Sequence, residues 1–194
     1  KFYKGKKACA LSAALRGNPS LFDGKKLGLV GLDIHFIDIL PSKVAEAVKI
    51  IYLSNNYLVN LANMDQFSKV ESASIMNNSI RYLDELQTLS RLKSLKSLSL
   101  QGNVVSKMPF YREHVVCMCP SLTLLDDEKV TADYREKCQS KLLVISTFYD
   151  YLRVNELRNG VLVHICKLME CHVEIYGKFG KGGCFRYVPA TPYS

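Results

Sequence analysis

The sequence predicts an α/β fold: a solenoid in which short parallel strands stack into one sheet, with a cap at each end and a long helix after the second cap. Three observations predict it. Between residues 27 and 108, one apolar pattern occurs four times. A different motif follows from Tyr111 to Val130, and beyond it apolar residues recur at helical spacing. A recurring period of roughly 20 to 50 residues is typical of solenoids, whose repeats bury their apolar sides against one another.

Each copy of the pattern has six matched positions, of which the fourth is polar. The copies are Leu27, Val30, Leu32, His35, Ile37, Leu40; Val48, Ile51, Leu53, Asn56, Leu58, Leu61; Val70, Ala73, Ile75, Asn78, Ile80, Leu83; and Leu95, Leu98, Leu100, Asn103, Val105, Met108. The polar position recurs after 21, 22 and 25 residues. This is the pattern L-x-x-L-x-L-x-x-N-x-L of a leucine-rich repeat.

The middle of each copy is expected to be a strand whose side chains alternate between core and surface. Leu53 and Leu100 then point inward, while Tyr52 and Ser99 point outward. The polar side chains are expected to end the strand and to bond backbone groups of the turn and of a neighbouring repeat. We name these repeat anchors: His35, Asn56, Asn78 and Asn103. For His35, a structural role is favoured over a ligand role.

The ends of a solenoid need caps, because the first and last repeats otherwise expose apolar surface. A short helix over residues 8–15 is predicted as the first cap, with core residues Ala10, Leu11, Ala14 and Leu15. Between repeats, a spacing of three residues along Leu86, Leu89 and Leu92 predicts a 3₁₀ or short helical segment.

The motif after the repeats has the form Y-R-x-x-V-x-x-x-x-P-x-L-x-x-L-D-x-x-x-V. Its residues are Tyr111, Arg112, Val115, Pro120, Leu122, Leu125, Asp126 and Val130. It resembles the C-terminal cap of the short-repeat, phosphatase-regulator-like branch of leucine-rich repeat proteins, which includes the spliceosomal A-prime protein and several axonemal and centrosomal proteins. The resemblance covers residues 27–130. It implies an arc with a concave parallel sheet, a helix near residues 110–119 and a last strand near residues 122–125.

A helix is predicted over residues 132–157, because apolar residues recur there at spacings of four and three. Its apolar side is expected to meet another element or another chain; the interface residues are Leu142, Ile145, Phe148, Tyr149 and Leu152. A hairpin is predicted over residues 173–188. Three parts result: a basic, helical N-terminal cap at 1–26, the repeats with their C-terminal cap at 27–130, and a helical extension at 131–194. Because the first residue is Lys1, we expect the sequence to be an internal piece of a longer protein.

The net charge of +8 lies at the two ends of the sequence. Residues 1–26 carry seven Lys or Arg against one acid, residues 27–130 carry ten against eleven, and residues 131–194 carry nine against six. Nucleic acid would therefore be contacted only through the basic ends. No apolar run reaches the roughly 18 residues that suggest a membrane span, so no membrane contact is expected.

Candidate chemical sites are weak. Seven scattered cysteines without a C-x-x-C pair favour free thiols in a reducing compartment. The glycine-rich run over residues 177–183 lacks the G-K-[ST] ending of a phosphate loop. His164, Cys166, Cys171 and His172 lack the usual short zinc knuckle, and Cys117 and Cys119 near His114 are more simply core residues of a cap helix. We therefore expect no enzyme activity, no cofactor and no metal.

The concave face is the stronger candidate site. Alternation along the strands predicts a small, uncharged, serine-rich floor without Lys or Arg, on which Tyr52 and Met76 would anchor a partner. The predicted floor residues are Leu29, Gly31, Asp33, Ile50, Tyr52, Ser54, Ser72, Ser74, Met76, Ser97, Ser99, Gln101 and Leu124.

These features favour a non-catalytic scaffold that binds a partner helix or segment within a multi-subunit cytoskeletal, ciliary or centrosomal assembly, with a cytoplasmic location. A first alternative is a nuclear ribonucleoprotein scaffold that grips an RNA-binding domain. A second is a phosphatase regulatory subunit, which rests on the family resemblance alone.

Overall fold

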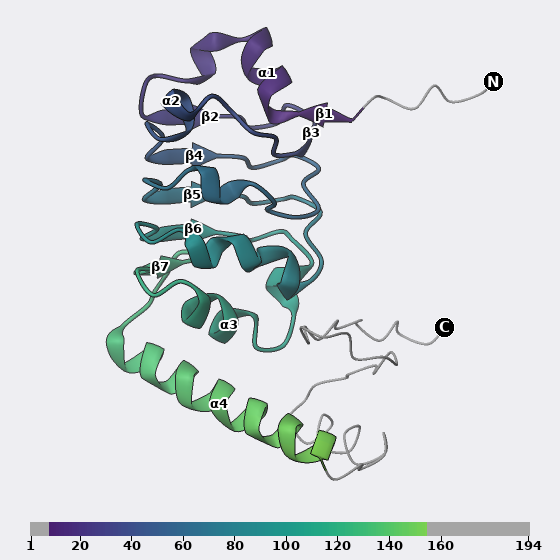
Figure 1. Ribbon diagram of the computed structural model, residues 1–194, viewed down its shortest axis with the longest axis vertical. Helices are drawn as coiled ribbons and strands as arrows, with labels where there is room; N and C mark the ends of the chain where they lie inside the picture. Colours follow the sequence, from purple (N-terminus) through teal and green to yellow (C-terminus); the bar gives the residue numbers. More distant parts are fainter. Residues whose placement is uncertain (1–7, 155–194) are drawn as a thin grey trace, which may run out of the picture.

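The computed structural model describes residues 8–154, with side chains through residue 143, and shows a stack of repeats with a helix at either end (Figure 1). A six-stranded sheet runs along one side of the stack in the order β2 (Lys26–Gly28), β4 (Ile50–Tyr52), β5 (Ser72–Ser74), β6 (Ser97–Ser99), β7 (Leu124–Leu125) and β8 (Glu128–Lys129). The first five strands are parallel, and β8 pairs antiparallel with β7. The predicted leucine-rich repeat solenoid is confirmed.

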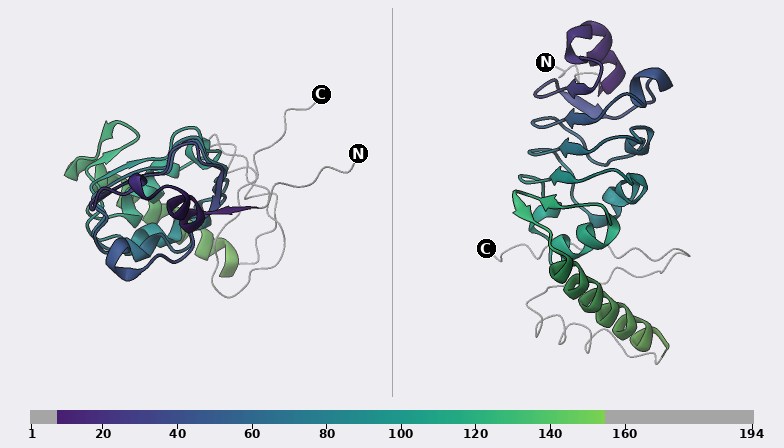
Figure 2. Two further views of the ribbon diagram at one scale, coloured as in Figure 1. Left: turned by 90° about the horizontal axis from the view of Figure 1, so that it is seen from above. Right: turned by 90° about the vertical axis from the view of Figure 1, so that its left-hand side faces the viewer.

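The side opposite the sheet is built from short helical turns, as Figure 2 shows from two further directions. They are α2 (Ser42–Ala45), η2 (Met64–Gln66), η3 (Leu83–Arg91) and η4 (Val105–Lys107). The 3₁₀ helix η3 buries Leu86 and Leu89 at the predicted three-residue spacing. These turns and the strands enclose one apolar core, in which Leu53, Phe67 and Leu100 are fully buried.

The asparagine anchors bond the backbone of two repeats at once. Asn78 Nδ2 donates to the carbonyls of Ile75 in its own repeat (3.1 Å) and of Leu53 in the preceding repeat (2.9 Å). Its Oδ1 accepts the N–H of Leu58, again in the preceding repeat, at 3.0 Å. Asn56 and Asn103 make the same kinds of bond, and all three side chains are buried. The asparagines therefore join each repeat to the one before it.

The predicted register of the first repeat is wrong by three residues. Strand β2 pairs Leu27 with Ile51, so Leu27 and Leu29 are the buried positions and Val30 is exposed. The position equivalent to Asn56 is therefore Leu32, and His35 does not stand at the anchor position. His35 nevertheless contacts backbone groups: its Nδ1 lies 2.7 Å from the Asp33 carbonyl and 3.2 Å from the Cys9 nitrogen, and its ring stacks on Tyr57 with centroids 5.2 Å apart.

The N-terminal cap consists of α1 (Leu11–Gly17), η1 (Pro19–Leu21) and a short strand that the sequence did not predict. Strand β1 (Cys9–Ala10) pairs in parallel with β3 (Ile34–Phe36) in a separate two-stranded sheet. Leu11 is fully buried, and Ala14 and Leu15 pack against the same core. Asp38 accepts the N–H of Ser12 at 2.8 Å and also the Ser12 hydroxyl, which ties α1 to the first repeat.

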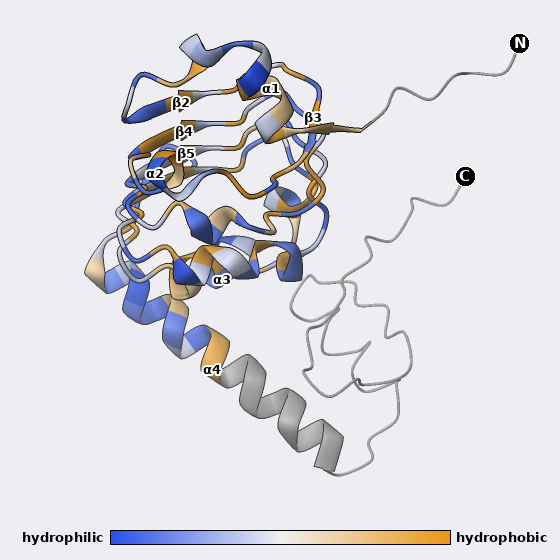
Figure 3. Cartoon of the chain, turned by 45° about the horizontal axis from the view of Figure 1, so that its top comes forward, coloured by the Kyte–Doolittle hydropathy of each residue, from blue (hydrophilic) through white to orange (hydrophobic). Residues whose placement is uncertain are grey.

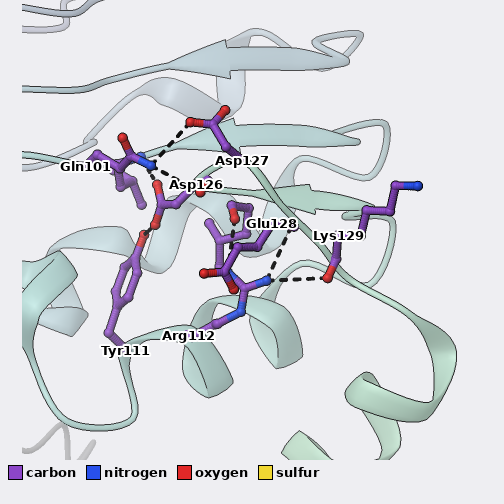
Figure 4. A network of polar contacts seen from close by, with 9 residues as sticks. Gln101, Tyr111, Arg112, Asp126, Asp127, Glu128 and Lys129 are labelled. Atoms are coloured by element: carbon purple, nitrogen blue, oxygen red, sulfur yellow. Dashed lines mark hydrogen bonds and ion pairs between the residues drawn. The ribbon is translucent and has the colours of Figure 1, made fainter.

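The C-terminal cap contains α3 (Tyr111–Met118), β7 and β8, with a polar network between them (Figure 4). The Tyr111 hydroxyl donates to Asp126 Oδ2 at 2.7 Å, and burial together with this bond raises the pKa of Tyr111. Asp126 Oδ1 accepts the N–H of Leu100 at 2.7 Å. Arg112 Nη1 donates to the Leu125 carbonyl at 2.9 Å. The Tyr, Arg and Asp of the sequence motif thus bind the last strand to the cap helix.

Helix α4 (Ala132–Val154) leaves the stack beside α3 (Figure 1). The residues of its first turns are largely hydrophilic, as the blue in Figure 3 shows, while Cys138 is buried against the cap. Leu142 is half-buried, and the side chains of Ile145, Phe148, Tyr149 and Leu152 lie outside the described residues, as do the predicted hairpin, the glycine-rich run and the His164 to His172 cluster. Within residues 8–154, no helix is long and apolar enough to cross a membrane.

Candidate protein-binding face

The concave face is formed by the outward side chains of the parallel strands, which stand in rows because the strands are in register. The first row is Lys26, Ile50, Ser72, Ser97 and Leu124, and the second is Gly28, Tyr52, Ser74 and Ser99. Val30, Ser54, Met76 and Gln101 form a third row, joined by backbone bonds such as that from the Asn55 N–H to the Met76 carbonyl (2.9 Å). The intervening residues, such as Ile51 and Leu98, are fully buried.

Three predicted residues of this face are wrong. Leu29 is fully buried in the core, Gly31 stands in the turn after β2 with a φ of 68°, and Asp33 lies between that turn and strand β3, with a φ of 55°. The three-residue register error arises because the first repeat has no asparagine. Leu32 stands at the anchor position, and aligning the polar His35 with Asn56 instead shifts the repeat by three residues. A better guide is the series Ile34, Ile37 and Leu40, which matches Leu58, Leu61 and Met64 at a constant offset.

The corrected register places Lys26 and Gly28 on the face, so the predicted absence of Lys and Arg is also wrong. Lys26 Nζ lies 4.9 Å from the centroid of the Tyr52 ring, a cation–π contact. Gly28 leaves space beside Tyr52, because a Cβ there would meet only the Leu21 carbonyl, at 3.8 Å. The first strand therefore contributes a positive charge and an opening next to the largest side chain of the floor.

The middle of the floor is uncharged and small. Ser54 and Ser74 hydroxyls bond each other at 2.8 Å, and Met76 lies half-buried beside them. Gln101 Nε2 donates to the Asp126 carbonyl (3.1 Å) and to Asp127 Oδ2 (3.3 Å), which fixes it against the C-terminal cap. The small serines thus lie between three larger, half-buried apolar side chains of the floor, Ile50, Tyr52 and Met76.

One end of the strands is lined by lysines. Lys49, Glu71 and Lys96 precede β4, β5 and β6, and Glu71 bridges the two lysines with carboxylate contacts of 3.4 Å to Lys49 and 2.9 Å to Lys96. The hydrogen bonds from Lys96 and then Lys49 hold the pKa of Glu71 below its usual value. Lys25 and Lys26 lie at the corresponding end of β2, and Lys129 of β8 pairs with Leu124. We call Lys25, Lys26, Lys49, Lys96 and Lys129, together with Glu71, the basic edge.

Comparison with known proteins identifies the family. The model of the family described as "Leucine-rich repeat" matches residues 22–144. The chain belongs to the leucine-rich repeat family. Proteins of this family generally act as non-catalytic scaffolds, and the resemblance stated from the repeat and cap motifs is confirmed.

Among the relatives is the U2 small nuclear ribonucleoprotein A' of Saccharomyces cerevisiae, 37% identical over 91 residues, which are 46% of this chain and 38% of that protein. The dynein axonemal assembly factor 1 homolog of Drosophila pseudoobscura is 32% identical over 97 residues, 48% of this chain and 6% of that protein. A solved structure, the Drosophila melanogaster SNF/U2A' complex, is similar over 59% of this chain and 79% of that chain, with 26% identity and a TM-score of 0.48. The chain thus spans well under half the length of these two relatives.

Proposed function

We propose that this chain is a non-catalytic scaffold whose concave face binds a helix or extended segment of a partner protein within a cytoskeletal, ciliary or centrosomal assembly. One observation carries the proposal: the floor combines apolar contact at Ile50, Tyr52 and Met76 with small serines between them. The backbone N–H and C=O groups of the parallel strands already bond one another, so a partner would be bound through these side chains. The likeness to an axonemal assembly factor supports the cellular setting.

A second function is favoured by one specific observation, the 37% identity to a U2 small nuclear ribonucleoprotein A'. In this alternative, the same face grips a protein with an RNA-binding domain in the nucleus, and basic residues near the chain ends contact RNA. A third alternative, a phosphatase regulatory subunit, has no support beyond the family likeness. Helix α4 would offer a second contact through Leu142 and the predicted interface residues that follow it.

The test is capture of partner proteins by the whole chain and by a Tyr52→Asp, Met76→Asp double variant. The expected result is that most of the proteins are no longer captured. A bound partner would have to bury the two new carboxylates against an apolar surface, which costs free energy. The matched control is Ser68→Asp, an exposed change between η2 and β5 that should capture the same proteins as the unaltered chain. Unchanged capture by the folded double variant would refute the concave-face proposal. Captured RNA whose amount falls steeply with added salt would favour the ribonucleoprotein alternative.

A further inference from the structure

The basic edge carries an excess of positive charge that the fold itself does not use. Glu71 is its one acid, and it already contacts two of the five lysines. The side chains of Lys49 and Lys96 remain 50% and 62% exposed, and Lys25, Lys26 and Lys129 are exposed residues. Asp23 lies next to the edge, since its carboxylate accepts the N–H groups of Lys25 (3.0 Å) and Lys26 (2.7 Å). Together with Glu46 it is matched in charge by Lys69 and Lys93 of the other preceding turns, so the positive excess of the edge remains. Exposed ion pairs of this kind contribute little to stability, so the edge is available for a partner.

The edge also lies beside the apolar part of the floor. Lys25, Lys49 and Lys96 directly precede β2, β4 and β6, and Lys26 and Lys129 lie within β2 and β8. The first row of the floor begins next to them with Ile50, Ser72 and Ser97. Lys129 stands on the same side as its partner Leu124, because directly opposed residues of an antiparallel pair share one face. A ligand that covers Ile50 and Tyr52 therefore has the lysines along one of its sides.

From this arrangement, which rests on the proposed function, we infer that the partner segment is an acidic amphipathic helix lying across the strands, with its apolar side on the floor and its carboxylates against the basic edge. The spacing suits a helix. Strands lie about 4.8 Å apart, so Lys49 and Lys96, two strands apart, are separated by about 10 Å. Residues seven positions apart in an α-helix are separated by about 10.5 Å.

An RNA strand fits the same surface less well. The far end of the strands carries Asp126 and Asp127, whose carboxylates would repel a phosphate backbone that covers the floor, whereas a helix with its carboxylates on one side turns none of them toward this end. One face of the Tyr52 ring, where a base would stack, is covered by Lys26. The observations therefore favour an acidic protein segment.

The probe is a fluorescein-labelled amphipathic peptide of about 18 residues, with leucines along one side and glutamates beside them about seven positions apart. Anisotropy titration at low salt compares it with the same peptide carrying glutamine at the acidic positions. The expected result is about tenfold weaker binding of the glutamine peptide, since several exposed ion pairs of modest strength are lost. A Lys49→Glu, Lys96→Glu double variant should lose binding to a similar extent. The control is Lys43→Glu, Lys107→Glu, which makes the same charge change at exposed sites in α2 and η4.

Rescue separates recognition from damage to the fold: a lysine version of the peptide should bind the Lys49→Glu, Lys96→Glu variant better than the unaltered chain. Equal binding of the acidic and glutamine peptides, no binding of the acidic peptide, or tighter binding of a single-stranded RNA would each overturn the inference. If the acidic peptide binds the Tyr52→Asp, Met76→Asp variant as tightly as the unaltered chain, the basic edge binds acidic segments by itself. The proposed binding of a partner by the floor then fails. If that variant loses the peptide while Lys49→Glu, Lys96→Glu keeps it, the floor binds and the acidic inference fails.

Discussion

The backbone N–H and C=O groups of the turns find their hydrogen-bond partners in different ways in the middle repeats and at the two ends of the solenoid. In the middle, one residue type serves every repeat: Asn56, Asn78 and Asn103 each reach back to the repeat before. At the C-terminal end, the carboxylate of Asp126 accepts the N–H of Leu100, a group that in earlier repeats bonds a carbonyl of the next strand. At the N-terminal end, Asp38 instead accepts the N–H and the hydroxyl of Ser12 in the first turn of α1.

This difference explains why the first repeat lacks an asparagine. Each anchor mainly serves the preceding repeat, and the first repeat has none before it, so Leu32 stands at that position without leaving a neighbour unsatisfied. The buried amide is thus a feature of the junction between two repeats. Its absence marks where the stack begins.

Removing a junction anchor should have the largest effect. Asn56→Ala would leave the N–H groups of Leu32 and Ile34 and the carbonyl of Leu29 without their side-chain partner. Since a buried unsatisfied polar group costs about 1–3 kcal/mol, we expect a loss of about 4 kcal/mol in the free energy of unfolding, measured by urea denaturation.

The control is Asn60→Ala, the same change at an exposed asparagine that bonds only the Ala62 N–H at 3.0 Å. It should cost less than about 1 kcal/mol. A similarly small loss of stability in Asn56→Ala would mean that water or a shifted turn replaces the bonds of the anchor. The middle repeats would then not depend on a buried asparagine, and this difference from the ends of the solenoid would disappear.

The glycine turns test the same comparison with a smaller effect. Gly102 and Gly31 both have positive φ, +78° and +68°, and follow the strands of the last and first full repeats. A Cβ at Gly102 would lie 1.9 Å from Oδ1 of Asn77, whose Nδ2 bonds Asn55, whereas a Cβ at Gly31 meets nothing within 4 Å. Gly31→Ala should therefore cost about 1 kcal/mol from φ alone, and Gly102→Ala about 2 kcal/mol. Thermal or urea unfolding measures both, and equal losses would show that Asn77 moves aside freely.

Most of the fold could be predicted from the sequence because it repeats. The apolar series from Val48 onward fixed the strands at Ile51, Ala73 and Leu98 and the anchors at Asn56, Asn78 and Asn103. The cap motif likewise located α3 and β7. Strand β8 and strand β1 were not predicted, since each has only two residues and no internal pattern.

The candidate site was less predictable, because one misplaced repeat changes which residues face outward. A three-residue shift exchanges the two faces of a strand, whose side chains alternate. It hid Lys26, Gly28 and the beginning of the basic edge, and it placed Leu29 on the surface. The edge also depends on which lysines become neighbours in the sheet, and charge totals along the sequence do not contain that information.

A further effect of modest size concerns pH and the C-terminal cap. Cys119 is fully buried there, and burial raises its pKa to about 11. An unfolded thiol has a pKa of about 8.5, so the folded chain holds this proton more tightly than the unfolded chain. The resulting stability is complete below about pH 8.5 and falls as pH rises toward the folded value. Between pH 8 and about 10, before the tyrosines of the unfolded chain titrate, the free energy of unfolding of the unaltered chain should fall by about 1–2 kcal/mol more than that of the Cys119→Ala variant.

Urea unfolding under reducing conditions measures this difference. A middle-repeat change such as Asn60→Ala should leave the pH dependence unaltered, and parallel pH profiles for the chain and Cys119→Ala would show that the buried thiol contributes nothing to it.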